Sequence, residues 1–129
     1  MPQFVILFHE MPAGATRASH WDFMVEQNGV LMTWALEREP RANEIIEATR
    51  LPDHRLAYLD YEGEVSAGRG NVTRYERGEY CLAHNDPDHL LLTLCSQKLI
   101  GRVTLDRDAD SHRWRFSFVA AAEVAVGTS

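Results

Sequence analysis

The sequence has few of the features that mark a membrane-bound or secreted protein. No apolar run approaches the roughly 20 residues that a membrane-spanning helix needs. At the start of the sequence, residues 1–4 include no basic residue ahead of the short apolar stretch that begins there. Only two cysteines occur, Cys81 and Cys95, and they lack the close spacing of a zinc ribbon or a redox motif. We therefore expect a cytoplasmic protein without membrane contact, with both cysteines as reduced thiols in its core.

Positive charge is also scarce. There are 13 lysines and arginines against 19 acidic residues, so the formal net charge is −6. A protein that holds nucleic acid through a broad electrostatic footprint usually concentrates basic residues on one face. Lys98 is the only lysine, and the arginines that make up the rest suit bidentate contact with phosphate. Any contact with nucleic acid should therefore be local.

The chain has the length and composition of one globular domain, spanning residues 1–129, with 45% hydrophobic and 25% charged residues. Its β-branched and aromatic residues gather in short runs, which is typical of strands. The runs are residues 4–8, 21–25, 30–36, 56–61, 71–75, 80–83, 90–95, 99–105 and 114–119. So many short strands can stack as a sandwich or close into a barrel, and we favour the barrel because closure removes exposed edges.

Turn residues separate these runs and indicate antiparallel hairpins. They are Asn28-Gly29, Arg77-Gly78, residues 86–88 and residues 106–111. One short helix is predicted over residues 41–48, with Asn43 as its cap, Ile45 and Ile46 facing the core, and Pro52 beyond its end. The predicted fold is mainly β, a closed antiparallel β-barrel with one short flanking helix.

The most informative stretch is residues 19–26. In a strand, side chains alternate between faces, so His20 and Asp22 point one way while Trp21 and Phe23 point the other. His9, at the end of the first strand, would complete a set of two nitrogen ligands and one oxygen ligand at the mouth of the barrel, which suits Mn²⁺, Zn²⁺ or Fe²⁺. From spacing alone, a solvated His-x-Asp pair is the commoner alternative.

Further polar residues could complete a site for a phosphate ester. His54 and Tyr58 would share a strand face if the strand began at His54, and they could move a proton and stabilise a phosphoryl oxygen. Arg17, in the loop 11–19, could reach a bound phosphate, and Arg69 lies in a small-residue loop that could approach an anion. The alternatives are that Tyr58 packs in the core, that His54 is an ordinary loop residue, and that the loops with Arg17 and Arg69 merely connect strands.

The order of these motifs resembles the 3′-phosphoesterase domain of bacterial DNA ligase D. The resemblance rests on His9, His20-Trp21-Asp22-Phe23, residues 28–31 and 33–35, Asp53-His54 with Tyr58, Glu62-Gly63, Arg77-Gly78, residues 98–102 and Trp114. It implies a β-barrel enzyme, dependent on Mn²⁺, that removes a terminal 3′-phosphate and, in typical members, a terminal ribonucleoside. It also implies nucleic-acid 3′ ends as substrates and a DNA ligase or end-joining proteins as partners.

Carried over residue by residue, the resemblance assigns a role to each polar residue of the site. It makes the metal ligands His9, His20 and Asp22, places His54 and Tyr58 at the phosphate or metal-bound solvent, and puts Arg38 where the family usually has a lysine. Mn²⁺ is the expected metal, with Zn²⁺ and Co²⁺ as alternatives.

The sequence departs from the family pattern at three points. The interval from His9 to His20 is longer than in the typical domain. Met24 and Ile46 stand where the family has arginines, and losing such a phosphate contact costs several kcal/mol of transition-state stabilisation unless another cation replaces it. Arg17 and Arg69 are the candidate replacements.

Three functions therefore stay open. The first is a stand-alone metal-dependent 3′-phosphoesterase of DNA repair, with activity weakened by the two lost arginines. The second is a non-catalytic module that binds nucleic-acid ends in a repair complex. The third uses the same two-histidine, one-carboxylate set for a non-haem iron oxygenase on a cupin-like barrel.

Overall fold

The computed structural model describes residues 1–109 and 111–121, and in these residues the chain forms nine strands and one 3₁₀ turn. The elements are β1 (Gln3–Glu10), β2 (His20–Gln27), β3 (Val30–Leu36), β4 (Ile45–His54), η1 (Leu56–Leu59), β5 (Gly63–Glu64), β6 (Asn71–Asp86), β7 (His89–Ser96), β8 (Ile100–Arg107) and β9 (Arg113–Ala120). No helix in the described part of the chain is long and apolar enough to cross a membrane.

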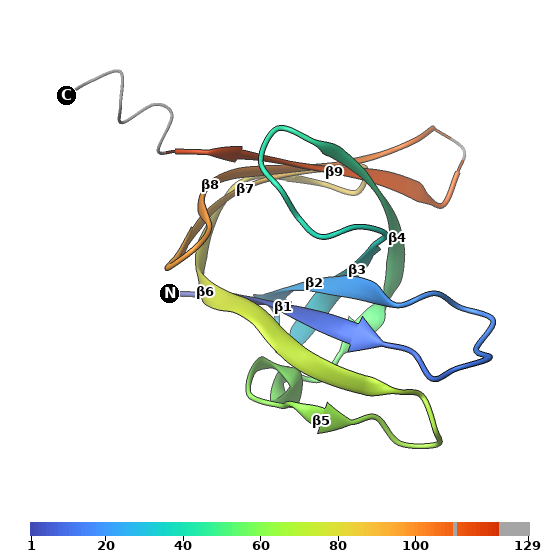
Figure 1. Cartoon of the computed structure of the whole chain (residues 1–129). Coiled ribbons are helices and arrows are strands. Elements are labelled where there is room, and N and C mark those ends of the chain that lie inside the picture. The colour runs from blue at the N-terminus through green and yellow to red at the C-terminus, as the bar shows by residue number, and fades with distance from the viewer. Residues whose placement is uncertain (110, 122–129) are drawn as a thin grey trace.

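The strands pair antiparallel and return on themselves as a ring (Figure 1). The order is β1-β2-β3-β4-β9-β8-β7-β6, and β6 pairs back with β1, while β5 extends β6 on its outer side. The mainly β class and the antiparallel pairing are confirmed. Eight strands thus have neighbours on both sides, which leaves little free edge.

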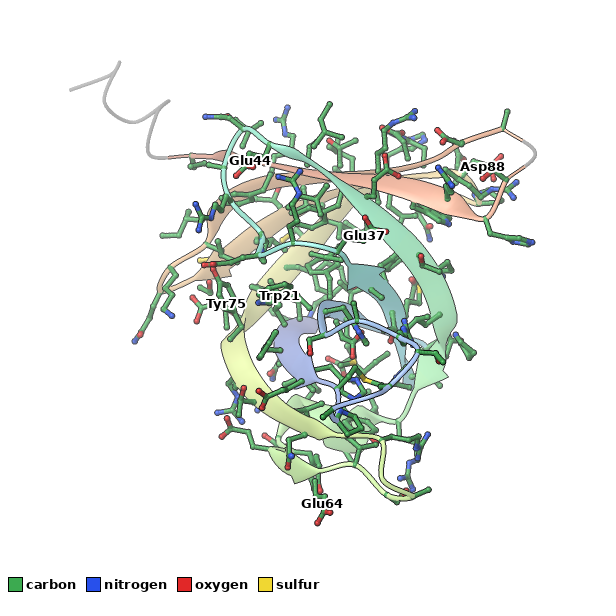
Figure 2. All side chains as sticks on the ribbon, turned by 45° about the vertical axis from the view of Figure 1, so that its right-hand side comes forward. Trp21, Glu37, Glu44, Glu64, Tyr75 and Asp88 are labelled. Carbon is green, nitrogen blue, oxygen red and sulfur yellow. The ribbon has the colours of Figure 1, made fainter. Side chains whose placement is uncertain are left out.

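The ring is filled by a large apolar core, to which all eight of its strands contribute (Figure 2). Aromatic rings meet edge to face inside it, with centroids 5.6 Å apart for Trp34 and Trp114 and 5.4 Å apart for Phe23 and Phe116. Both tryptophans are buried, as expected for packing residues.

A second, smaller core lies on the outer face of the sheet. Because side chains alternate, Val5, Leu7 and Met24 point away from the ring interior that their neighbours fill. The segment that carries η1 and β5 folds over this outer face and adds Leu59 and Val65 (Figure 1). Strands β1 and β2 are therefore buried on both faces where this segment covers them.

The helix expected over residues 41–48 is wrong. Asn43 adopts a left-handed conformation with φ of 65°, and β4 begins at Ile45. Ile45 is 64% exposed while Ile46 is fully buried and pairs with Phe116 of β9, which is the alternation of a strand. Two adjacent β-branched residues and the available partner strand outweigh the weak helical signal.

Two other expectations about local structure are also wrong. Residues 56–61 form the 3₁₀ turn η1 and its exit, not a strand. Arg77 and Gly78 make no turn but lie inside β6, opposite Val5 and Phe4. A Cβ atom on Gly78 would clash with the Cys95 carbonyl oxygen and press on the Phe4 ring, so this glycine permits close packing.

The turn at Asn28-Gly29 is confirmed. Both residues have positive φ, 54° and 83°, as a two-residue hairpin loop between β2 and β3 requires. The cysteines are free, but both are exposed on the outside of the ring, so the prediction that they lie in the core is wrong. In their strands, both cysteines occupy positions that alternate onto the solvent face. The apolar residues that flank them gave no sign of this.

Candidate metal centre and its pocket

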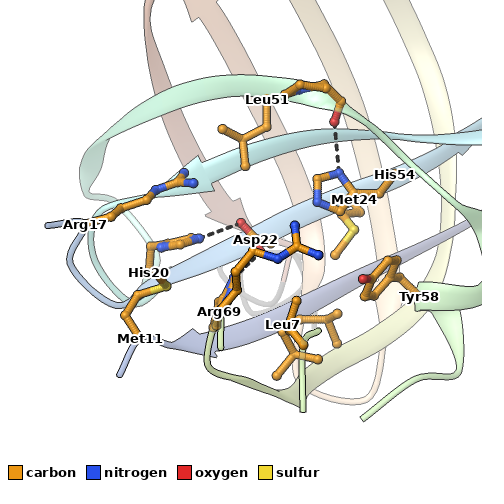
Figure 3. A pocket seen from close by; sticks show the side chains of 14 residues that line it. Leu7, Met11, Arg17, His20, Asp22, Met24, Leu51, His54, Tyr58 and Arg69 are labelled. Atoms are coloured by element: carbon orange, nitrogen blue, oxygen red, sulfur yellow. Dashed lines mark hydrogen bonds and ion pairs between the residues drawn. The ribbon is translucent and has the colours of Figure 1, made fainter. Parts of the chain in front are cut away.

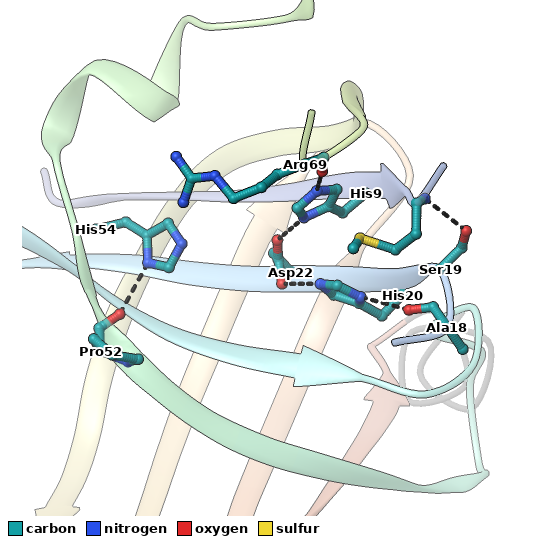
Figure 4. A network of polar contacts seen from close by, with 9 residues as sticks. His9, Ala18, Ser19, His20, Asp22, Pro52, His54 and Arg69 are labelled. Atoms are coloured by element: carbon teal, nitrogen blue, oxygen red, sulfur yellow. Dashed lines mark hydrogen bonds and ion pairs between the residues drawn. The ribbon is translucent and has the colours of Figure 1, made fainter. Parts of the chain in front are cut away.

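His9, His20 and Asp22 converge on one point. His9 at the end of β1 lies directly across from His20 at the start of β2, and Asp22 follows two residues later on the same face (Figure 4). Their potential ligand atoms all lie within 4.8 Å of one another. His20 Nε2 is 3.1 Å from Asp22 Oδ1, and His9 Nδ1 is 3.5 Å from Asp22 Oδ2. This cluster is what alternation within β2 and pairing with β1 predict.

Each imidazole is held by its other nitrogen. His20 Nδ1 donates to the Ala18 carbonyl oxygen at 2.9 Å, and His9 Nε2 donates to the Arg69 carbonyl oxygen at 2.6 Å. A neutral imidazole with one nitrogen donating has a lone pair on the other, and here that lone pair faces the carboxylate. His20 Nε2 and Asp22 Oδ1 are buried without a hydrogen-bond partner in the described structure, so this pair suits a shared cation or proton.

The electrostatics of the cluster favour positive charge beside the carboxylate. Asp22 and His20 are only 3% and 5% exposed. Burial opposes ionisation of Asp22, but contacts with His20 and His9 outweigh it and lower the pKa of its carboxyl group. Asp22 can accept a hydrogen bond from the protonated form of His9, and this raises the pKa of His9 above its ordinary 6.5, against the opposing effect of burial. Asp22 is thus an anion that holds a proton or a cation nearby.

The cluster opens into a pocket of about 360 Å³ (Figure 3). Part of its wall is apolar, where Leu7, Met24 and Val72 come from the smaller core. The polar residues predicted from sequence also line it, namely His54, Tyr58, Arg17 and Arg69. The folding of η1 and of two loops over one sheet face therefore brings these loops together with residues of β1, β2 and β4.

The site does not lie at the mouth of the closed sheet, where the sequence placed it. Asp22 and Met24 share the outer face of β2, whereas Phe23 and Val25 point into the ring. The pocket is therefore on the outside of the ring, between the sheet and the segment that carries η1 and β5. Alternation predicts which residues share a face but does not say which face is outside.

His54 and Tyr58 meet, although not by sharing a strand. His54 ends β4 and Tyr58 lies in η1, and their rings pack edge to face with centroids 5.6 Å apart. His54 Nδ1 donates to the Pro52 carbonyl oxygen at 2.9 Å, so its Nε2 remains for a ligand in the pocket. The prediction that His54 and Tyr58 share a strand face is wrong, but the 3₁₀ turn brings their rings together as predicted.

The two candidate replacement arginines both reach the pocket. Arg69 is held by Ser66, with Nε 2.8 Å from the carbonyl oxygen and Nη2 3.0 Å from Oγ. Arg17 has no ion pair in the described part of the chain. Met24 and Ile46 supply no cation in their place, because Met24 forms part of the pocket's apolar wall and Ile46 points into the ring.

Arg38 is not brought to this pocket. Its guanidinium contacts the Glu44 carboxylate at 2.8 Å and the Ile45 carbonyl oxygen at 2.6 Å. Glu44 lies at the end of the molecule away from Glu64 of β5, as Figure 2 shows. The strand β3 ends two residues before Arg38, and the chain then turns away from the pocket.

Backbone groups that orient the site could not be recognised in the sequence. The carbonyl oxygens of Ala18, Pro52 and Arg69 hold the three histidines, and carbonyl groups leave no side-chain signature. The glycine at position 70 was the one sign of this arrangement in the sequence. Its φ is 90°, and a Cβ atom there would clash with the Glu10 carbonyl oxygen. A glycine there lets the loop that ends in Arg69 approach the end of β1.

The ring of strands and the two-histidine, one-carboxylate pocket define a small all-β protein with a candidate metal-assisted site on its outer face. Residues 13–107 match the family model of the DNA ligase D 3′-phosphoesterase domain, and the chain belongs to this family. The match begins after His9, so His9 is placed in the site by its pairing with His20 between β1 and β2 and by its contact with Asp22.

Similarity to individual proteins agrees with the family. The chain is 31% identical over 120 residues to the multifunctional non-homologous end joining protein LigD of Mycobacterium bovis, covering 86% of this chain. It is 33% identical over 99 residues to the protein of the same name from Pseudomonas aeruginosa, covering 68% of this chain. The chain spans only 15% and 12% of the length of these two relatives.

Proposed function

We propose that the protein is a metal-dependent phosphoesterase that removes 3′-phosphates, and terminal ribonucleosides, from nucleic-acid ends during end-joining repair, beside a DNA ligase or end-joining proteins. One observation carries the proposal. The free nitrogens of His9 and His20 and both oxygens of Asp22 face one another in a pocket, while backbone carbonyl oxygens hold the opposite nitrogens. Metal-ligating histidines are generally held in this way.

The donor set fits a divalent cation. Two imidazole nitrogens and one carboxylate oxygen suit Mn²⁺, our first choice, and also Zn²⁺ or Co²⁺, with positions open to water and substrate. When bound, such an ion would polarise a phosphoryl oxygen and lower the pKa of bound water.

The chain's own residues would bind the ester and manage its protons. Arg17 and Arg69 line the pocket and would hold the phosphate through charge-assisted hydrogen bonds. The nitrogen of His54 that is not bonded to Pro52 is available to exchange a proton with the leaving oxygen, and the Tyr58 hydroxyl to stabilise charge on the phosphoryl group. The apolar wall formed by Leu7, Met24 and Val65 limits water in the pocket.

The test is release of inorganic phosphate from a 3′-phosphorylated oligonucleotide. We expect stimulation by Mn²⁺, loss with a chelator, and loss in His20→Ala. The matched control is His84→Ala, because His84 also contacts an aspartate but lies exposed outside the pocket. Circular dichroism would verify that both variants fold. Activity that survives both chelation and His20→Ala would remove the proposal.

A second candidate function is a module that binds ends without catalysis. It is favoured by Met24 and Ile46, which supply no cation, and by Arg69, whose guanidinium is already bound to Ser66. Binding of a 3′-phosphorylated strand, with no turnover in the presence of Mn²⁺, Zn²⁺ or Co²⁺, would favour this candidate.

A further inference from the structure

A second pocket adjoins the candidate metal centre. It has a volume of about 200 Å³ and shares Tyr58 and Val65 with the first. Its other lining residues include Arg55, Tyr61 and Glu64. The two pockets therefore meet at Tyr58, so a molecule whose phosphate lies in the first can extend past this ring into the second.

The second pocket has an aromatic wall held in one position. The Tyr61 hydroxyl donates a hydrogen bond to the Glu64 carbonyl oxygen, and its ring meets Tyr58 edge to face with centroids 5.7 Å apart. Tyr61 nevertheless remains 39% exposed. Tyr58 also packs against His54. The rings of His54, Tyr58 and Tyr61 therefore form a row that extends from the first pocket into the second. A fixed, exposed ring of this kind is a stacking surface for a base.

The charges at the second pocket favour a base inside and a phosphate at its edge. Glu64 lines it and disfavours an anion within. Arg55 also lines it, is exposed, and forms no ion pair in the described part of the chain. One uncompensated guanidinium can contact one phosphodiester.

We propose that this pocket binds the base of the nucleotide that carries the 3′-phosphate, with Tyr61 stacking on the base and Arg55 contacting the phosphodiester on its 5′ side. The inference rests on the proposed function and adds a base subsite to it. Because stacking tolerates any base, the subsite would distinguish ends that have a terminal base from ends that lack one, rather than one base from another.

The first experiment uses a single-stranded 3′-phosphorylated oligonucleotide with 2-aminopurine as its terminal base. Stopped-flow mixing with the Mn²⁺-loaded protein reads the fluorescence before turnover. We expect quenching with the natural protein and with Tyr61→Phe, which keeps the ring. We expect the quenching to be lost, and binding to weaken about tenfold, in Tyr61→Leu. Leu56→Ala is the control, because Leu56 is exposed in η1 but lines neither pocket.

The second experiment changes the ligand instead of the protein, so it does not depend on how a variant folds. A strand with an abasic terminal nucleotide should bind the natural protein about tenfold more weakly than the intact strand. The same change should have no further effect on Tyr61→Leu, because the stacking partner is already missing.

The third experiment tests Arg55 through the salt dependence of binding. Removing one phosphate contact from a single strand should reduce the slope of log affinity against log salt by about 0.7. We expect this reduction in Arg55→Gln and no change in Arg102→Gln, an exposed arginine on β8 outside both pockets.

The outcomes separate the two proposals. If the natural protein binds intact and abasic 3′-phosphorylated strands equally well, the base subsite is wrong while the proposed function stands. If it binds no 3′-phosphorylated strand, both are wrong.

Discussion

Two histidines of the pocket are oriented by the same local device. In both His20 and His54, Nδ1 donates to the carbonyl oxygen two residues earlier in the chain, at 2.9 Å in each case. This bond selects the tautomer whose Nε2 is free, and it directs that nitrogen into the pocket. At the residue scale, the polar side chains that line the pocket could be named from the sequence, with Arg38 wrongly included, but the carbonyl groups that orient them could not.

The raised pKa of His9 gives a prediction about metal binding. The proton that Asp22 stabilises on His9 competes with a metal for Nδ1. The affinity for Mn²⁺ should therefore fall as the pH drops through the raised pKa of His9, by up to about tenfold per pH unit for each proton displaced. Titration calorimetry at several pH values between 6 and 8.5, in buffers of different ionisation enthalpy, measures both the affinity and the protons released. An affinity independent of pH over this range would contradict His9 as a ligand.

At the scale of elements, the loop that ends at Gly70 supports the site from outside. A Cβ atom on Gly70 would clash with the Glu10 carbonyl oxygen and move the Arg69 carbonyl oxygen away from His9. We expect Gly70→Ala to lower the free energy of unfolding by more than about 1 kcal/mol and to weaken Mn²⁺ binding about 10- to 100-fold. Chemical denaturation and metal titration measure the two effects.

Gly68→Ala is the matched control for this prediction. Gly68 also has positive φ, 67°, but nothing lies within 4 Å of its Cβ position. This variant should bear the backbone strain alone and keep its Mn²⁺ affinity. Equal losses of metal affinity in the two variants would show that strain, and not the contact with Glu10, governs the position of Arg69.

The turn η1 is held to the sheet by Arg77 of β6. Its guanidinium donates to the Leu59 carbonyl oxygen at 2.9 Å, to Asp60, and to Gln3 Oε1 at 2.9 and 2.6 Å. Because η1 carries Tyr58, Arg77→Met should loosen one wall of both pockets, raising KM for a 3′-phosphorylated strand more than it lowers kcat. It should also destabilise the fold by about 1–3 kcal/mol.

Steady-state kinetics and thermal unfolding test this role, with Arg102→Met as a control on the exposed surface of β8. An unchanged KM in Arg77→Met, with lower stability, would assign Arg77 to the fold alone.

Local pattern predicted most strands but not the covering segment. Residues 30–36 match β3 because its ends are defined by a tight turn and by the last apolar residue. Residues 56–61 have the composition of a strand, yet they pair with no strand in the described part of the chain, and Leu59 packs instead into the smaller core. Residues 71–83 appear as two strands in the sequence, whereas β6 runs through Gly78 because its side-by-side partners β1 and β7 continue the pairing.

At the scale of the whole molecule, two cores on opposite faces of one sheet explain the position of the site. Residues Phe4 to Leu7 are all buried, with Phe4 and Ile6 inside the ring and Val5 and Leu7 outside it. A continuous apolar run signals burial on both faces but not what covers each face. Closure of the sheet and the covering of its outer face both depend on contacts between distant segments, which local periodicity does not encode.

A contact between β6 and the connection from β3 to β4 affects stability at high pH. Tyr75 of β6 donates a hydrogen bond to Glu39, in the connection between β3 and β4, at 2.9 Å, and Lys98 lies over its ring. Burial, together with the bond and charge of Glu39, raises the pKa of Tyr75 to about 12. A pKa raised above the ordinary 10.0 means that folding favours the neutral phenol, so this stabilisation is fully present below pH 10 and disappears between pH 10 and 12.

We therefore expect the free energy of unfolding to fall over this interval and to fall less steeply in Tyr75→Phe, which has no proton to lose. Urea denaturation from pH 9 to 12 measures both slopes, while ultraviolet absorbance follows phenolate formation. Tyr80 also has a raised pKa, because of burial and the charge of Glu26, so part of the slope should persist in Tyr75→Phe. Identical slopes in the two proteins would mean that the phenol of Tyr75 titrates as freely in the folded chain as in the unfolded one. The bond from Tyr75 to Glu39 would then not contribute to the stability of the fold.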